Sequence, residues 1–271
     1  MSFTIRLKPE DIRRIDQSDM GGHIANMGSH IREGVKLGAE VGVPISAEKC
    51  KSILVLGMGG SAIGGDLVKA YLSKLRIPFF VHRGYELPEW VNEETLVIAS
   101  SYSGNTEETL STFEEAAKKK LPILCITTGG MLAERAKALA LPMVTIPGGM
   151  QPRAAIAYSF ACILLAVEKM SGGHSESANL ERAAAMLDSL AARYGVEQLD
   201  EKNLAFKLAG NLVHRIPVIY SSVNEEPIAL RWRGQIQENG KHIAFANILP
   251  EMNHNEIEGW AHPIDLVQHF A

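Results

Sequence analysis

Aromatic residues and basic charge are both scarce in this chain of 271 residues. Aromatic residues make up 6% of it, and 27 Lys and Arg face 31 Asp and Glu, which gives a formal net charge of −4. A chain without a basic excess lacks the field that grips a phosphate backbone, so no nucleic-acid partner is expected. The hydrophobic fraction of 46% is still ordinary for a globular protein and is enough to build a sizeable core.

Cysteine and long apolar runs are scarce as well. The three cysteines, Cys50, Cys125 and Cys162, are far apart and form no CxxC pair, so we expect neither disulfides nor a zinc site. The longest apolar run, residues 154–167, is shorter than the roughly 18 residues that a membrane-spanning helix needs. The N-terminus is charged and interrupted by Pro9, unlike a signal peptide. These features predict a cytoplasmic protein with no membrane partner.

Glycine, at 24 positions, is plentiful, and strand-like and helix-like patterns alternate along the chain. Short, nearly continuous apolar runs are typical of parallel strands that are covered on both faces. Strand, helix and strand in series predict right-handed crossovers and an α/β fold with doubly wound parallel sheets flanked by helices. The expected strands are residues 53–57, 78–82, 95–100, 122–127 and 142–146, and the expected helices are 61–75, 105–119, 131–139 and 154–171.

The second half of the chain repeats this alternation with fewer strands. A Gly- and Ser-rich stretch at 171–177 is typical of a linker. We therefore expect an N-terminal helical segment at 1–50, a first α/β domain at 51–172, and a helical connection with an incomplete second α/β domain at 173–271. The expected helices of this half are 178–194, 198–214, 225–239 and 263–270, and the expected strands are 217–221 and 242–248.

The first candidate site is the glycine-rich loop GMGGSAIGG, residues 57–65, which follows the first strand and opens a helix. Glycines let the backbone approach a ligand, and the N–H groups at a helix start favour an anion. A tight turn without a ligand is the alternative. Gly57, Gly59 and Ala62 also fit the dinucleotide pattern G-x-G-x-x-A, but Arg83 stands where an acidic residue would hold the ribose. NAD is therefore disfavoured, and an NADP-linked reductase stays open as a weaker alternative.

The second candidate site is the hydroxyl-rich loop SSYSGNT, residues 100–106, which follows the third strand. Several hydroxyls and backbone N–H groups at one helix start can donate to the oxygens of a terminal phosphate. Ordinary helix capping is the alternative, because Ser, Asn and Thr are common caps and Glu107 and Glu108 suit the helix dipole. One hydroxyl is enough for a cap, so the several hydroxyls here favour a bound phosphate.

These motifs resemble the SIS (sugar isomerase) domain, and their order is similar to that in the bifunctional phosphoglucose/phosphomannose isomerase family. The resemblance covers roughly residues 50–263, and several motifs in one order are far more specific than one glycine loop. The motifs are Gly59-Gly60-Ser61, Ser101-Tyr102-Ser103-Gly104-Asn105-Thr106, Gln151-Pro152-Arg153-Ala154-Ala155, Arg231-Trp232-Arg233, Gln237-Glu238-Asn239-Gly240-Lys241 and Glu251-Met252-Asn253-His254-Asn255-Glu256.

The resemblance implies two SIS lobes and an isomerase that interconverts glucose 6-phosphate with fructose 6-phosphate; it leaves open whether mannose 6-phosphate is accepted. It implies a homodimer whose site is shared between subunits, and no cofactor or metal. It also assigns roles: Ser101, Ser103 and Thr106 hold the phosphate, Gly59, Gly60 and Ser61 line the sugar site, Arg153 lies near the C1 and C2 oxygens, Glu238 is the catalytic base, and His254, supplied in the family by the partner subunit, helps to open the ring.

General chemistry agrees with three of these roles. One carboxylate over one face of the substrate can move a proton between C2 and C1 through an enediolate, which suits Glu238. The enediolate needs a fixed cation, such as Arg153, and ring opening needs a group that delivers a proton near neutral pH, such as His254. Without the resemblance, Glu238 is more simply a surface carboxylate, and the cluster Arg231–Arg233 is more simply structural.

One feature departs from the family. Family members continue for a substantial stretch after the histidine motif, complete the second sheet and supply a lysine to the site, whereas this chain ends at Ala271. The sequence therefore predicts an incomplete second lobe with an exposed sheet edge, which dimerisation would cover. A non-catalytic sugar-phosphate sensor is accordingly the alternative to an enzyme.

Overall fold

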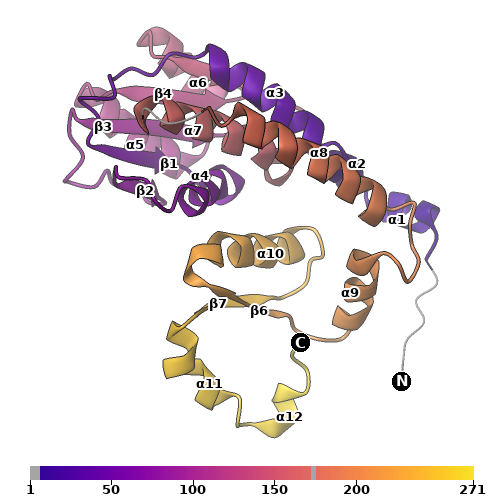
Figure 1. Cartoon of the computed structure of the whole chain (residues 1–271). Helices are drawn as coiled ribbons and strands as arrows, with labels where there is room; N and C mark the ends of the chain where they lie inside the picture. The colour runs from indigo at the N-terminus through magenta and orange to yellow at the C-terminus, as the bar shows by residue number, and fades with distance from the viewer. Residues whose placement is uncertain (1–6, 172–174) are drawn as a thin grey trace. The chain divides into compact units, whose positions relative to one another are not determined.

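The computed structural model describes residues 7–171 and 175–271, and the chain forms two compact units (Figure 1). The first unit is Ser18–Ala191, and the second joins the N-terminal residues up to Gln17 with Ala192–Ala271. The domain boundary expected at 172/173, and part of the expected linker at 171–177, lie outside the described residues. The expected domain limits therefore stay a prediction.

The first unit is built on a five-stranded parallel sheet in the order β2-β1-β3-β4-β5. The chain passes from β1 to β2 on one side and then returns to β3 on the other side, so the strand order reverses between β1 and β3. Open α/β sheets bind their ligands outside the carboxyl ends of the strands at such a reversal. The strands, all five at the expected places, are β1 (Ser52–Leu56), β2 (Phe79–His82), β3 (Thr95–Ser101), β4 (Ile123–Thr127) and β5 (Met143–Thr145).

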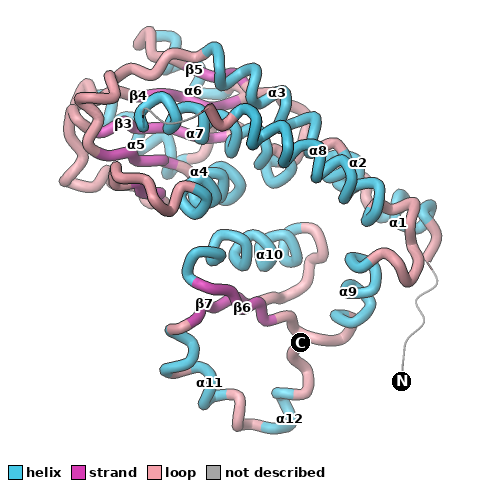
Figure 2. The backbone as a smooth tube through the Cα atoms, in the orientation of Figure 1, coloured by secondary structure: helices cyan, strands magenta, loops and turns pink. Residues whose placement is uncertain are grey.

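Helices cover both faces of this sheet, as Figure 2 shows, which confirms the expected α/β class. One face packs against α3, α4 and α7, and the other packs against α5 and α6. The expected helix at 154–171 is preceded by a 3₁₀ helix, η1, at Pro152–Ala154. The α-helices are α2 (Met20–Ala25), α3 (Met27–Glu40), α4 (Gly59–Tyr71), α5 (Glu107–Lys118), α6 (Gly130–Ala138), α7 (Ile156–Ser171) and α8 (Ser177–Tyr194).

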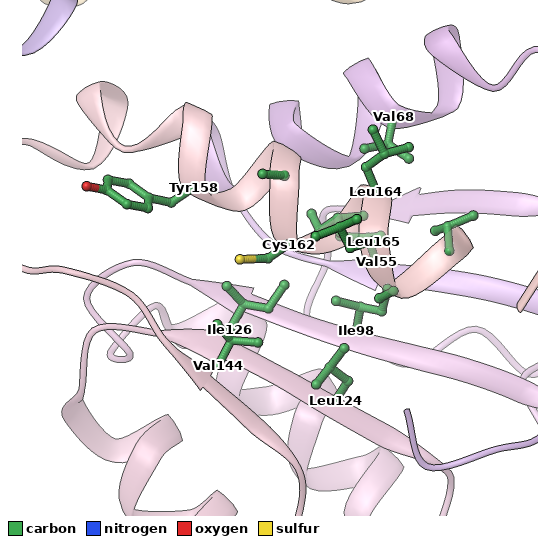
Figure 3. Close-up of a cluster of buried hydrophobic side chains, with 14 of the residues drawn as sticks. Val55, Val68, Ile98, Leu124, Ile126, Val144, Tyr158, Cys162, Leu164 and Leu165 are labelled. Carbon is green, nitrogen blue, oxygen red and sulfur yellow. The ribbon is translucent and has the colours of Figure 1, made fainter. Parts of the chain in front are cut away.

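Alternate strand residues supply two hydrophobic clusters, one on each face of the sheet. Val55 and Ile98 pack with Leu164 of α7 in the first cluster (Figure 3). Their chain neighbours Leu54 and Val97 belong to the second cluster, on the opposite face. Because side chains alternate along a strand, a sheet that is buried on both faces needs apolar residues at every position, which explains the continuous apolar runs.

The second unit contains a two-stranded parallel sheet, which confirms the two strands expected there. Helix α10 connects the two strands and packs against both of them. None of the helices within residues 7–171 and 175–271 is long and apolar enough to cross a bilayer. The elements are α1 (Pro9–Ile15), α9 (Leu204–Leu212), β6 (Val218–Ser222), the 3₁₀ helix η2 (Val223–Glu225), α10 (Glu226–Glu238), β7 (Phe245–Leu249), the 3₁₀ helix η3 (Glu251–His254), α11 (Glu256–Gly259) and α12 (Ile264–Val267).

Two helices of this unit are shorter than expected. The helix expected at 198–214 begins only at Leu204, because buried Asn203 caps it by accepting a 2.9 Å hydrogen bond from the N–H of Phe206. The helix expected at 263–270 is reduced to α12, and the residues after it run beside β6.

The last residues of the chain partly cover the edge of β6. The carbonyl of His269 accepts a hydrogen bond from the N–H of Ile216 at 2.7 Å, and the carbonyl of Ala271 accepts one from Val218 at 2.8 Å. Phe270 forms a parallel bridge with Ile216. The expectation of an exposed edge is therefore wrong for the part of this edge near Ile216 and Val218, because backbone pairing satisfies it there.

Candidate functional site

The loop after β3 is held by hydrogen bonds that centre on Ser101. This serine ends β3 and is 1% exposed. Its Oγ lies 2.9 Å from Oγ1 of Thr106 and accepts a hydrogen bond from the N–H of Gly104 at 3.1 Å. The hydroxyl of Thr106, at the start of α5, is therefore engaged with Ser101 and not with the N–H groups of the helix. Exposed Ser103 accepts a hydrogen bond from the N–H of Asn105 at 3.2 Å.

The start of α6 supports the same loop. The side-chain oxygen of Asn105 accepts a hydrogen bond from the N–H of Met131 at 3.0 Å. Gly104 has a φ of +69°, and a Cβ there would lie 1.9 Å from the carbonyl oxygen of Gly129. Only glycine fits this position, because the backbone is left-handed and a neighbouring backbone segment fills the space of a side chain.

Three motifs that are far apart in the sequence come together at this loop. The N–H of Tyr102 donates to Oγ of Ser61 at 3.2 Å, which ties the loop to the start of α4. Gly60 lies against η1, since a Cβ on it would be 3.0 Å from the carbonyl oxygen of Pro152 and 3.4 Å from Cα of Arg153. The glycine loop, the hydroxyl-rich loop and the Gln151–Arg153 segment therefore meet where the strand order reverses.

Sequence reasoning missed the importance of Tyr102. Its backbone bonds to Ser61, its carbonyl accepts a hydrogen bond from the hydroxyl of Thr128 at 2.8 Å, and its own hydroxyl accepts one from the N–H of Met150 at 3.0 Å. One residue thus connects the start of α4, the loop after β4 and the segment before Gln151. The sequence did contain a signal of this third loop. Residues 127–130 form a small polar run at the carboxyl end of β4, just as the other two candidate loops lie at the ends of their strands.

One residue of the glycine loop, Gly65, and one residue outside it, Arg83, have structural roles. A Cβ on Gly65 would lie 3.1 Å from side-chain atoms of both Val55 and Val81, so this glycine lets α4 pack closely on β1 and β2. Arg83, on which the NADP alternative rests, forms an ion pair with Asp66 of α4. This pairing gives the guanidinium a structural role and removes the reason for the NADP alternative.

The two residues expected to move protons belong to the second unit. Glu238 is the last residue of α10, and its carbonyl accepts a hydrogen bond from Nζ of Lys241 at 2.7 Å. His254 is exposed and ends η3, the 3₁₀ helix that follows β7. The structure therefore brings the phosphate and sugar motifs together in one unit and holds Glu238 and His254 in the other. In the described parts of the chain, no three His, Cys, Asp or Glu residues are grouped as metal ligands.

This fold, with small polar loops at the strand-order reversal, defines a protein of the SIS class. Residues 47–168 match the family model described as SIS domain, and residues 201–271 match the model described as Bacterial phospho-glucose isomerase C-terminal SIS domain. A solved glucose-6-phosphate isomerase from Chlamydia trachomatis shares the fold, with a TM-score of 0.66 and 14% identity over 88% of this chain and 55% of that chain.

Sequence comparison identifies the family within this class. The chain is 43% identical over 242 residues to the bifunctional phosphoglucose/phosphomannose isomerase of Caldicellulosiruptor bescii. The matched region covers 89% of this chain and 71% of the relative. It is 41% identical to the enzyme of the same name from Aquifex aeolicus, over 79% of this chain and 63% of the relative. The chain belongs to the bifunctional phosphoglucose/phosphomannose isomerase family and spans about two thirds of the length of these relatives.

Proposed function

We propose that this protein is an aldose–ketose isomerase that interconverts glucose 6-phosphate and fructose 6-phosphate. The observation that carries the proposal is the convergence of three small polar motifs on Tyr102 in a chain of this family. The curated relatives named above are enzymes, so the non-catalytic sensor is not favoured.

The phosphate of the substrate would bind the loop after β3. Ser101, Ser103 and Thr106 supply hydroxyl groups there, and the start of α5 supplies backbone N–H groups that favour an anion. The mutual hydrogen bond of Ser101 and Thr106 holds both hydroxyls in place before a ligand arrives. Gly59, Gly60 and Ser61 would line the adjacent sugar site.

Arg153 would stabilise the charge that develops during the reaction. It lies in η1, its Cα is close to the position of Gly60, and its Nη1 is 3.4 Å from Oε1 of Gln151. A guanidinium stays charged at neutral pH and presents a fixed set of donors. Placed beside the O1 and O2 atoms of the sugar, it would stabilise the enediolate more than the neutral substrate, which is what lowers the barrier.

Proton transfers by His254 and Glu238 would complete the reaction. His254 would give a proton to the ring oxygen while the C1–O5 bond breaks and the C1 hydroxyl loses its proton, which leaves an open-chain aldehyde. Glu238 would then remove the proton from C2; the electron pair forms the C1–C2 double bond, and the C1 oxygen carries the negative charge until it is protonated. Return of the proton from Glu238 to C1, with loss of the O2 proton, gives the ketose. No external oxidant or reductant is needed. His254 would protonate the ring oxygen, Glu238 would carry the proton between C2 and C1, and water would accept or supply the protons that O1 and O2 lose or gain.

The partners follow from the same proposal. The substrate is a small sugar phosphate, and the site would be shared between the two subunits of a homodimer, with His254 supplied by one subunit to the other. A cytoplasmic location is part of this proposal.

A coupled assay tests the proposal directly. The chain is incubated with glucose 6-phosphate or mannose 6-phosphate, and formation of fructose 6-phosphate is followed. We expect turnover of glucose 6-phosphate, and an Arg153→Lys variant should lower kcat by about tenfold to a hundredfold while the KM changes little. Binding of the sugar phosphate without turnover at high protein concentration would establish the sensor alternative instead.

A further inference from the structure

Tyr220 and Asn247 face each other across the two-stranded sheet of the second unit and bind the same carboxylate. They are register partners on β6 and β7, so their side chains project from the same face of the sheet. The hydroxyl of Tyr220 donates to Oε1 of Glu256, and Nδ2 of Asn247 donates to Oε2. Nε1 of Trp260 in turn donates to the hydroxyl of Tyr220 at 2.8 Å. Glu256, at the start of α11, is therefore held through both carboxylate oxygens.

The segment that carries His254 is fixed at both ends. Met252, two residues before the histidine, is 6% exposed and anchors η3 to the interior of the unit. Glu256, two residues after it, is anchored on β6 and β7. Asn255 fastens the segment internally, because its Nδ2 donates to Oε1 of Glu251 at 2.9 Å. The side chain of His254 is exposed and is not held by packing around it. The position of this residue therefore depends on its two anchored neighbours, Met252 and Glu256.

We propose that Tyr220, Asn247 and Glu256 are positioning residues, which hold the backbone of His254 in the place from which its imidazole opens the sugar ring. This inference rests on the proposed function, because it takes the ring-opening role of His254 from there and assigns no chemistry to the three residues themselves. A carboxylate offers a separate charged oxygen to each of the two donors, which suits a Glu at this position.

The hydroxyl of Tyr220 stays protonated and can therefore donate its hydrogen bond to Glu256 at all times. Burial, and then the hydrogen bond to Glu256, raise the pKa of Tyr220 to about 12. The hydroxyl therefore keeps its proton throughout the neutral range.

Two substitutions loosen this arrangement to different degrees. Glu256→Gln places an amide N–H₂ opposite one of the two donors, and Tyr220→Phe removes only the hydroxyl. Loss of the anchor lets His254 drift, and a displacement of the order of 1 Å can cost a catalytic group up to about a hundredfold in rate. Ring opening should then slow down, whereas binding of a ligand that has no ring should not change.

The experiment compares turnover of cyclic glucose 6-phosphate with binding of 5-phospho-D-arabinonate, an acyclic sugar phosphate. Glu256→Gln and Tyr220→Phe should each lower kcat by about tenfold or more, with the inhibition constant of the acyclic ligand within about twofold of the unmodified chain. The matched control is Glu258→Gln, an exposed glutamate on the same short helix, which should leave both quantities unchanged. Tyr220→Phe keeps the test decisive if Glu256→Gln fails to fold.

Two results would overturn the inference. Normal kcat in both variants would show that the anchor does not matter, and a parallel loss of turnover and acyclic binding would show a merely structural role. His254→Asn separates this inference from the proposed function. A slow His254→Asn variant beside normal anchor variants contradicts only the positioning role, whereas normal turnover of His254→Asn contradicts the role of the histidine in the proposed function as well.

Discussion

Tyr102 donates its backbone N–H to the hydroxyl of Ser61 at 3.2 Å and accepts, on its own hydroxyl, the N–H of Met150 at 3.0 Å. The first contact joins two adjacent loops at the carboxyl edge of the sheet. The second fixes the segment that leads into Gln151 and Arg153. The placement of Arg153 relative to the phosphate loop therefore depends on this aromatic side chain as well as on the packing of Gly60 against η1.

Removing the hydroxyl of Tyr102 should weaken catalysis more than folding. Tyr102→Phe leaves the N–H of Met150 without its acceptor, so we expect the free energy of unfolding to fall by about 1 kcal/mol. The looser Arg153 segment should lower kcat by about tenfold. Thermal unfolding and the coupled assay measure the two effects, with Tyr194→Phe on α8 as the control. An unchanged kcat would show that Tyr102 does not position Arg153.

The phosphate loop should respond to loss of single hydroxyls. Ser101→Ala and Thr106→Ala each remove one potential phosphate ligand and the 2.9 Å contact between the two side chains. We expect the KM for the sugar phosphate to rise by about tenfold, because a hydrogen bond to a charged group is worth about 1.5–3 kcal/mol. Inhibition by inorganic phosphate should weaken in parallel. Ser73→Ala, an exposed serine after α4, is the control. A KM equal to that of the control would contradict the clamp.

Gly104 should tolerate no side chain. Gly104→Ala places a methyl group 1.9 Å from the carbonyl of Gly129 in a left-handed conformation. We expect a loss of at least about 2 kcal/mol in the free energy of unfolding. Gly42→Ala is the matched control, because a Cβ on Gly42 meets nothing within 4 Å. Equal unfolding midpoints in urea for the two variants would refute the assigned loop conformation.

The three cysteines should be inert in the folded protein. All three are free and buried, and burial raises the pKa of the Cys125 and Cys162 thiols to about 12. At pH 8 the native chain should not react with a thiol reagent, whereas the chain in denaturant should expose three reactive thiols. Rapid modification of any thiol in the native state would contradict this burial.

The same shifts predict how stability depends on alkaline pH. Because the folded-state pKa of Cys125 and Cys162 is raised above the ordinary thiol value of 9.0, the protonated thiols favour the folded state. Their contribution is fully present below pH 9 and is lost as the pH rises toward 12. Replacing either cysteine by alanine should flatten this decline in urea unfolding curves, and an unchanged slope would count against the assigned shifts.

The strands and loops of the first unit could be predicted from the sequence because more than one kind of residue pattern marks them. The strands at Val55 and Ile98 are buried on both faces, so apolar runs mark them clearly, and glycine and serine mark the loops at their carboxyl ends. The second unit was less predictable at its helix ends. The cap by Asn203 and the pairing of Phe270 with Ile216 are tertiary contacts that local periodicity does not report.

The candidate site divides in the same way. Ser101 and Thr106 are recognisable in the sequence as part of a cluster of hydroxyl residues. The structure adds that their side chains are hydrogen-bonded to each other. Tyr102 was invisible as a connecting residue, because its partners at Ser61 and Met150 are more than 40 positions away. The ion pair of Arg83 with Asp66, 17 positions apart, could not be predicted either, because it joins the end of β2 to α4 and local patterns do not report such tertiary contacts.

The central claim is that Glu238 moves the proton between C2 and C1. The measurement that tests it most directly is the rate of conversion of fructose 6-phosphate to glucose 6-phosphate by the unmodified chain and by Glu238→Gln. Glu225→Gln, at the residue that precedes α10, serves as the control, because the amide of the variant keeps an oxygen that can accept from the hydroxyl of Ser222. We predict a loss of about a hundredfold to ten-thousandfold for Glu238→Gln only. Equal turnover by Glu238→Gln and the unmodified chain would contradict the mechanism.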